Sequence, residues 1–337
     1  DNYWRALQPV LIDFEEAYVP VIDKFRPDVI HAHDFRMVGI AVRAAARAKQ
    51  TGRTVSVIYD AHEFAPGLEG TDEFVVGNAN YEAAHIRLAD RVVTVSEPLA
   101  DLLQKHHGLD RRPLVTLNAP EDLARNGDPE FTRDIRHDCG LSADTPLLVY
   151  SGGVARRRGL ETAAAGLVHL PGVHLAIIAS ADPEGRTLIR KAARKAGTTD
   201  RVHFQDFVPR SALIQHLRTA DIAVHPLLHL PNHEIALPNK FFDYVFAGLP
   251  MVVSDVEHLA ETVQKCDVGR SFIAGDPEDF ARAVREVLAD LPRLRENVRA
   301  CPRRSEWTWE SQEPVLAELY AGLQTGLDPQ SADHAGG

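Results

Sequence analysis

The sequence predicts an α/β protein of two domains, each built on a parallel sheet with helices on both faces. Three observations predict it. The chain has 337 residues, which suits about two domains. Short apolar runs alternate with helical patterns, as in repeated βαβ units. Polar residues gather directly after those runs, where parallel sheets bind ligands.

The first half alternates in this way after an opening helix over about residues 4–25. The expected strands are 28–32, 55–59, 91–95 and 114–117, and the expected helices between them are 38–49, 80–89 and 97–106. Ser96 is interpreted as the N-cap of the last of these helices, and His106 and His107 as its solvated end.

A polar, turn-rich stretch over residues 120–145 predicts the link between the domains. The second series has expected strands at 147–150, 174–178, 202–204, 222–226 and 251–254, and expected helices at 160–168, 184–196, 211–219, 240–246 and 277–288. We therefore expect domains over residues 1–130 and 131–310, a helix over 311–324 that could cross back to the first domain, and a disordered tail over 325–337.

Composition excludes several classes of protein. The formal charge of −11 argues against a nucleic-acid partner, because such proteins carry a basic footprint. No apolar run reaches the length of about 18 residues that a membrane helix needs. A basic cluster at Arg43, Arg47, Lys49 and Arg53 predicts at most peripheral membrane contact. Three widely spaced cysteines and no visible secretory signal suit the cytoplasm.

The first candidate motif is the string YSGGVARRRG. It runs from a strand into a loop with Gly152 and Gly153, and a helix begins shortly after Arg158. Glycine lets a ligand approach the backbone, a helix start offers free N–H groups, and guanidinium groups match phosphate oxygens. The motif predicts a diphosphate site, although a turn with solvated arginines would show the same pattern.

The second candidate motif is the string ALPNKFFDYVFAGLP. Leu237 and Pro238 lead into a helix that starts at Asn239 and Lys240. Amides at that start and the Lys240 ammonium could hold the same diphosphate. Asp243 lies one turn inside the helix, and its carboxylate could accept hydrogen bonds from a ribose diol. The alternative interpretation of Asp243 is a helix-surface acid.

This second string, extended as ALPNKFFDYVFAGLPMVVSD, resembles the donor-site segment of family 4 glycosyltransferases, which have the GT-B fold. The match continues, in the family's order, through DVIHAHD, VIYDAHEFAPG, RVVTVSEPLADLL, LVYSGGVARRRGLET and RVHFQDFVPRSALIQHLRTADIAVHPL. The resemblance implies two Rossmann-like domains that face a central cleft. It also implies hexosyltransferase-like transfer from a nucleoside-diphosphate-sugar to the hydroxyl of a small-molecule or glycan acceptor, with retention of configuration. The nucleotide-sugar is then a co-substrate, and no metal ion or other cofactor is expected.

The resemblance also assigns roles on the donor side. Arg158 stands where the family has the basic residue that holds the diphosphate, beside the loop of Gly152 and Gly153. Many members carry arginine at the position of Gly153. Asp243 replaces the glutamate that binds the ribose, and Phe207 resembles part of the loop that faces the base, together with Val208.

Two features of the chain depart from the family pattern. The first motif glutamate falls at Ile235, so Glu234 is the candidate substitute. The first part of the N-terminal domain is expected to be absent, about three βα units or on the order of 100 residues. These departures leave open a non-catalytic auxiliary or binding subunit of the same fold, or a sugar-nucleotide 2-epimerase.

On the acceptor side, His62 resembles the family histidine that reaches the transferred sugar, with a capping or core histidine as the alternative. His62, Arg158 and Lys240 are therefore the expected catalytic residues. His31, His33, Asp34 and His62 could instead form a mixed metal site, but the cleft-rim interpretation explains the same residues, so no metal is assigned.

Overall fold

The computed structural model describes residues 3–121, 125–179 and 182–325 of the chain. It divides into two compact units. Unit 1 comprises Asp1–Leu117, Leu230–Ala236 and Glu313–Gly337, and unit 2 comprises Asn118–His229 and Leu237–Gln312. The boundary thus lies at residue 117 rather than 130, since the link packs on unit 2, where the Asp128 amide donates to Gln215 Oε1 (3.0 Å). The expected tail lies almost wholly outside the described residues.

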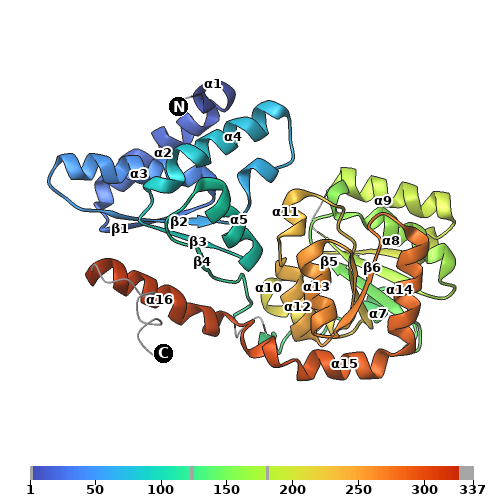
Figure 1. Cartoon of the computed structure of the whole chain (residues 1–337). Helices are drawn as coiled ribbons and strands as arrows, with labels where there is room; N and C mark the ends of the chain where they lie inside the picture. The colour runs from blue at the N-terminus through green and yellow to red at the C-terminus, as the bar shows by residue number, and fades with distance from the viewer. Residues whose placement is uncertain (1–2, 122–124, 180–181, 326–337) are drawn as a thin grey trace. The chain divides into compact units, whose positions relative to one another are not determined.

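Unit 1 is built on a four-stranded parallel sheet in the order β1-β2-β3-β4, with α3 packed against β1 and β2 (Figure 1). Its elements are α1 (Trp4–Leu7), α2 (Val10–Phe25), β1 (Val29–His33), α3 (Phe35–Gln50), β2 (Ser56–Ala61), α4 (Asp72–His85), β3 (Arg91–Thr94), α5 (Glu97–His107), β4 (Leu114–Val115), α11 (Pro231–Glu234) and most of α16 (Trp309–Thr325). The single helix expected over residues 4–25 is two helices separated by Gln8 and Pro9.

Helix α5 shows how local sequence sets the element ends. Ser96 accepts a hydrogen bond from the Leu99 amide (3.3 Å), which confirms the N-cap, and Gly108 ends the helix in the left-handed conformation. The expectation of a solvated end is wrong for His107. Its side chain is 3% exposed, because Nε2 lies 3.2 Å from the buried carboxylate of Glu82.

Unit 2 contains a six-stranded parallel sheet in the order β10-β9-β8-β5-β6-β7 (Figure 1). Its elements are α7 (Ile135–Asp138), β5 (Leu147–Ser151), α8 (Leu160–Gly166), β6 (His174–Ile178), α9 (Pro183–Ala196), β7 (Val202–Gln205), α10 (Arg210–Leu217), β8 (Ile222–His225), α12 (Asn239–Ala247), β9 (Met251–Ser254), α13 (Glu257–Lys265), β10 (Gly269–Phe272), α14 (Pro277–Ala289) and α15 (Leu291–Ala300). The sequence pattern did not predict β10, because its four residues include no β-branched side chain.

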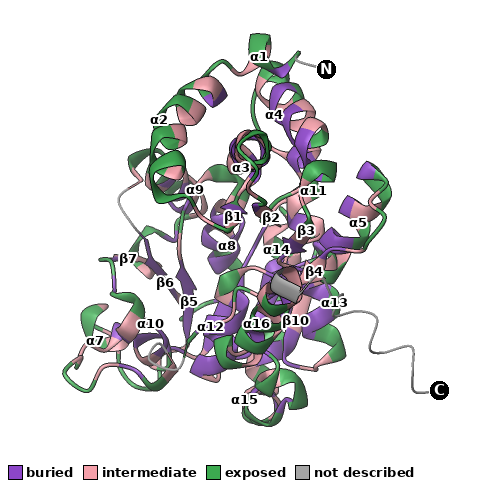
Figure 2. Cartoon of the chain, turned by 90° about the vertical axis from the view of Figure 1, so that its left-hand side faces the viewer, coloured by how far each residue is buried: buried purple, intermediate pink, exposed green. Residues whose placement is uncertain are grey.

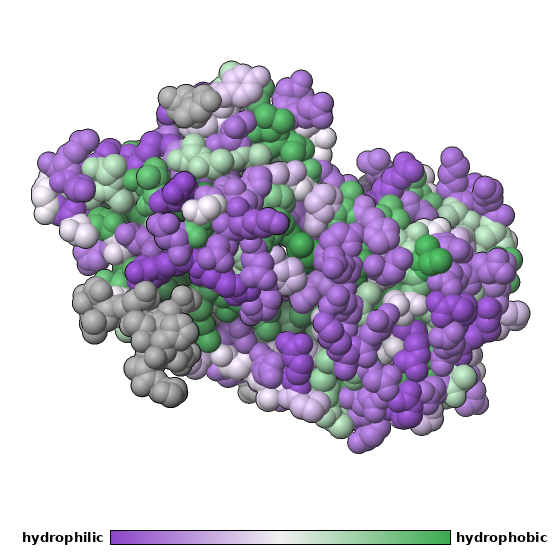
Figure 3. Space-filling model, in the orientation of Figure 1, coloured by the Kyte–Doolittle hydropathy of each residue, from purple (hydrophilic) through white to green (hydrophobic). Residues whose placement is uncertain are grey.

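Both sheets are parallel and are connected through helices, so the predicted α/β class is confirmed. Figure 2 shows the buried residues concentrated on the strands and the facing sides of the helices. The last helix packs on unit 1, where Leu319 joins Ile58 and Val93 in one apolar cluster. Hydrophilic side chains predominate on the face drawn in Figure 3. None of the helices in the described residues combines the length and apolar character that crossing a membrane requires.

Candidate functional site

Unit 2 has a pocket at the carboxyl ends of its central strands, with a volume of about 230 Å³. It is formed by the loop after β5, the ends of β6 and β7 and the start of α12. Its lining residues are Ser151, Gly152, Gly153, Ile178, Ala179, Phe207, Val208, Leu213, Asn239, Lys240 and Asp243. The structure therefore brings together seven residues predicted for the donor site from three separate segments.

The loop after β5 is held by hydrogen bonds from both sides. The Tyr150 hydroxyl donates to the Gly153 carbonyl (2.6 Å), and the Ser151 amide donates to the Tyr244 hydroxyl on α12 (3.1 Å). Gly152 has φ of 126°, a backbone conformation that favours glycine. The loop consequently presents its backbone, without side chains, to the pocket.

Gly152 is also in contact with Lys240, which yields a first prediction. A Cβ at Gly152 would lie 2.1 Å from Lys240 Cε, whereas a Cβ at Gly153 would have no neighbour within 4 Å. We expect Gly152→Ala to displace the lysine and to weaken nucleotide binding about tenfold or more, because the new residue is strained and blocks the cation. Gly197→Ala, at a glycine of unit 2 that also has a positive φ and where a Cβ would have no neighbour within 4 Å, is the matched control and should bind as the unmodified chain does, which calorimetry would show. Equal affinities of the two variants would contradict the assignment of Lys240.

Lys240 is the cation of the pocket. Burial, together with the positive charge of Arg158, lowers the pKa of Lys240 to about 8. Its ammonium nitrogen lies 5.7 Å from the Tyr150 ring centre. An incoming phosphate would pair with this ammonium, because its negative charge offsets the cost of burying the positive one.

This lowered pKa predicts a pH dependence for diphosphate binding. The anion favours protonated Lys240, so affinity should be highest below pH 8 and fall as the pH rises through the pKa, approaching tenfold per unit. Measurements from pH 7 upward keep the phosphate ionised. Calorimetry in two buffers of different ionisation enthalpy should detect proton uptake near pH 8.5. A flat affinity profile between pH 7 and 9.5 would exclude Lys240 as the phosphate ligand.

Asp243 is the acid of the pocket, and it is 3% exposed rather than a surface acid. Its Oδ1 accepts a hydrogen bond from Arg210 Nη1 (2.6 Å). Burial raises the pKa of Asp243, and the Arg210 guanidinium opposes that rise. Sequence reasoning missed Arg210, although it stands two residues after Val208 in the matched string VPRS.

The remaining donor-side predictions lie around this pocket or outside unit 2. Arg158 is half-buried on the short helix Arg156–Arg158 and acts on Lys240 through its charge. The Phe207 side chain is 69% exposed at the rim, and Val208 is buried. Leu237 and Pro238 precede α12 and are not among the lining residues.

Glu234 belongs to a different unit from the pocket residues. It ends α11, which belongs to unit 1. Two contacts attach this short segment to unit 1: Asn232 Oδ1 accepts from the Phe64 amide (2.7 Å), and the Ser96 hydroxyl donates to the Ile235 carbonyl (2.7 Å). The lining residues of the unit 2 pocket thus do not include the expected substitute for the first motif glutamate.

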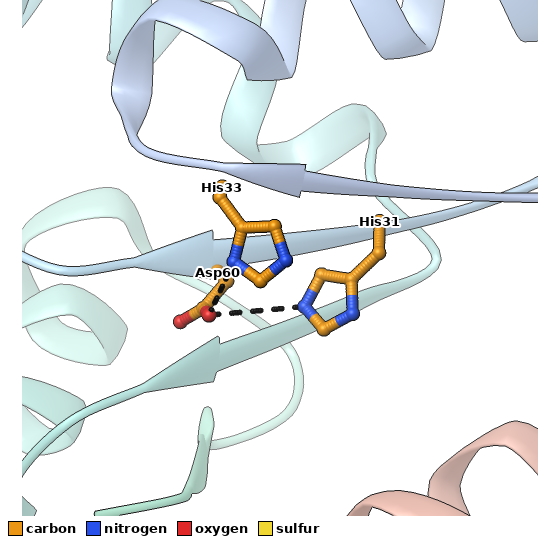
Figure 4. Close-up of side chains that lie close together, drawn as sticks. All are labelled: His31, His33 and Asp60. Atoms are coloured by element: carbon orange, nitrogen blue, oxygen red, sulfur yellow. Dashed lines mark hydrogen bonds and ion pairs between the residues drawn. The ribbon is translucent and has the colours of Figure 1, made fainter. Parts of the chain in front are cut away.

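Unit 1 has its own polar cluster at the carboxyl ends of β1 and β2 (Figure 4). Asp60 Oδ2 lies 3.0 Å from His33 Nδ1, 3.2 Å from His62 Nε2 and 3.8 Å from His31 Nε2. The hydrogen bond with Asp60 raises the pKa of His62. Burial acts to raise the pKa of Asp60, but the three histidines lower it overall. The carboxylate is therefore ionised, and it orients His62.

Asp34 does not join this cluster, contrary to the mixed site considered from the sequence. Its side chain caps α3 by accepting from the Arg36 amide (3.1 Å), and its φ is 75°. Asp60 supplies the carboxylate instead. The signal for it was present in the sequence, because Asp60 and His62 have the same two-residue spacing as His31 and His33.

Comparisons with known proteins identify both units. Residues 145–290 match the family described as "Glycosyl transferases group 1", and residues 3–125 match "Glycosyltransferase Family 4". The chain is 26% identical over 308 residues to glycogen synthase of Mycobacterium tuberculosis, covering 90% of this chain and 70% of that protein. It is also 26% identical over 311 residues to the D-inositol 3-phosphate glycosyltransferase of Nocardia farcinica, covering 87% of this chain and 66% of that protein.

Solved structures resemble the fold of this chain. Sucrose-phosphate synthase from Thermosynechococcus elongatus has a TM-score of 0.73 at 21% identity, covering 94% of this chain and 78% of that one. The Anabaena protein HepE, in complex with UDP-glucose, has a TM-score of 0.72 at 15% identity, covering 94% and 83%. These similarities show the GT-B fold. The chain is therefore a family 4-like glycosyltransferase of the GT-B fold, an enzyme that transfers a sugar from a nucleotide-sugar donor to an acceptor.

Proposed function

We propose that the unit 2 pocket binds a nucleoside-diphosphate-sugar and that the sugar, a hexose or a close relative, passes to an acceptor hydroxyl with retention of configuration. The main observation behind this proposal is the position of Lys240. Its half-buried ammonium, with a pKa of about 8, lies at the start of α12 beside the loop of Gly152 and Gly153, which has no side chains. The diphosphate would contact Lys240, Arg158 and the first amides of α12.

The ribose and the base of the nucleotide would contact the remaining side chains of the pocket. Asp243, held by Arg210, accepts hydrogen bonds from the ribose hydroxyls. Phe207 and Val208, with Ile178 and Ala179, provide apolar surface for the base. No nucleotide-binding role is proposed for Glu234.

We further propose that the protein stabilises the leaving group by charge alone. As the bond from the sugar to phosphate breaks, the cations and amides hold the negative charge on the diphosphate. The acceptor oxygen bonds to the sugar from the same face, and its proton passes to a phosphate oxygen. These steps use neither a protein nucleophile nor a metal ion at the diphosphate. In unit 1, His62 would contact the transferred sugar through the ring nitrogen that Asp60 leaves free.

The three cysteines carry free thiols, which suits the cytoplasmic location proposed for this reaction. The acceptor is proposed to be a small molecule or a glycan.

The first test is calorimetric titration with UDP, GDP, ADP, dTDP and CMP, without metal and then with magnesium. We expect one diphosphate to bind preferentially and equally well in both conditions. Arg158→Ala should weaken that binding about tenfold, because a charged phosphate contact is lost. Arg194→Ala, at an exposed position on α9, is the matched control. Unchanged affinity of Arg158→Ala would refute its role, and binding without sugar transfer or donor hydrolysis would favour the auxiliary subunit.

A further inference from the structure

The cluster in unit 1 follows from strand geometry. His31 and His33 are two residues apart on β1, so both side chains leave the same face of the strand. Asp60 on β2 is paired in register with His33. The two imidazole rings are stacked, with centroids 4.3 Å apart and planes at 15°. Both rings thus turn nitrogen atoms towards one carboxylate, as Figure 4 shows.

Hydrogen bonding alone does not satisfy this cluster. Asp60 Oδ2 already has His33 Nδ1 at 3.0 Å and His62 Nε2 at 3.2 Å. One carboxylate oxygen offers two lone pairs, so both are used. His31 Nε2, at 3.8 Å, is buried and has no hydrogen-bond partner among the described residues. A buried polar atom in that state costs free energy unless a ligand satisfies it.

The other ring nitrogen of His31, Nδ1, indicates which kind of ligand would satisfy Nε2. His31 Nδ1 lies 2.7 Å from the Tyr320 hydroxyl on α16. When Nδ1–H donates to that hydroxyl, Nε2 carries a lone pair that faces the carboxylate oxygen. In that tautomer the two electron-rich atoms, which lie 3.8 Å apart, repel each other, and a cation between them would bond to both.

We propose that His31 Nε2, His33 Nδ1 and Asp60 Oδ2 form a binding site for a divalent transition-metal ion of the zinc class. Their ligand atoms all lie within 4.8 Å of one another. In a tetrahedral zinc site neighbouring ligand atoms are about 3.3 Å apart, and the distances of 3.0 and 3.8 Å to Asp60 bracket that value. Two imidazoles and one carboxylate suit zinc better than magnesium or calcium, which prefer oxygen ligands.

Neighbouring groups complete the site. Tyr320 would orient His31, and His62 would hydrogen-bond the ligand Asp60, as outer-shell groups do around metal-bound histidine and carboxylate. The His33 side chain is 60% exposed, so water can reach the proposed site and could serve as a fourth ligand. The proposed site lies wholly in unit 1 and does not depend on the donor site of unit 2.

The test is titration of the EDTA-treated full chain with Zn²⁺ by calorimetry, and with Co²⁺ by visible absorption, which reports four-coordinate geometry. We expect one equivalent to bind. His33→Ala should lose binding at least tenfold, and Tyr320→Phe should weaken it about 10- to 100-fold, because an outer-shell partner is removed. His137→Ala, at a side chain 90% exposed in unit 2, is the matched control and should bind as before.

Circular dichroism of each variant in EDTA separates loss of the site from loss of the fold, and the exposed His33 is the substitution least coupled to folding. Absence of Zn²⁺ binding by the unmodified chain would overturn the proposal. Equal binding by folded His33→Ala and the unmodified chain would overturn it as well.

Discussion

His62→Gln is expected to reduce kcat for sugar transfer by at least about 100-fold while leaving the affinity for the nucleoside diphosphate unchanged. Glutamine keeps a polar group of similar length, but it lacks the imidazole that Asp60 orients through Nε2. The diphosphate contacts proposed here are all in unit 2, and His62 is in unit 1. The effect should therefore fall on turnover.

The measurement is steady-state transfer combined with calorimetry of the bare nucleotide. The His62 side chain is 38% exposed, so the substitution should change stability by no more than about 0.5 kcal/mol. His137→Gln, at an exposed histidine of unit 2, is the matched control. If His62→Gln retained the original kcat, the assignment of His62 to the transferred sugar would be wrong.

Lys240→Met should weaken nucleoside diphosphate binding about 10- to 100-fold, since a charged contact to phosphate contributes about 1.5–3 kcal/mol. Methionine preserves the length and apolar stem of the side chain and removes only the charge. The substitution should also abolish the fall in affinity above pH 8, because deprotonation of Lys240 causes that fall.

The same substitution should leave the melting temperature unchanged or raise it. Burial lowers the pKa of Lys240, which means that near pH 7 the charged ammonium is less favourable in the folded chain than in the unfolded one. Lys191→Met, at an exposed lysine on α9, controls for the change in net charge. Lost affinity together with a lowered melting temperature would indicate a structural role for Lys240 in place of phosphate binding.

Much of the donor site was predictable because its residues lie in short contiguous motifs. Asn239, Lys240 and Asp243 share the first turns of one helix, and helical spacing directs them to one region. Gly152 and Gly153 follow a buried strand directly, so the strand end positions them. The family resemblance indicated the role of each residue in the donor site, and the local sequence pattern indicated where each residue lies on its strand or helix.

Arg210 was not predictable in the same way. It reaches Asp243 from 33 residues away, and its own segment shows only a helix start after proline. The length and flexibility of arginine let it pair with any nearby acid, so the packing of α10 beside α12 decides the partner. The burial of His107 was not predictable for the same reason, because its hydrogen-bond partner Glu82 is 25 residues away in the chain.

The sequence alone specifies most of the succession of strands and helices and the position of the glycine loop after β5, because periodicity, caps and glycine positions act over a few residues. Tertiary structure decides which distant charges meet. The approach of Tyr320 to His31 spans 289 positions, and the attachment of Asn232 to Phe64 spans 168. Such contacts depend on how whole elements pack, and no local pattern carries that information.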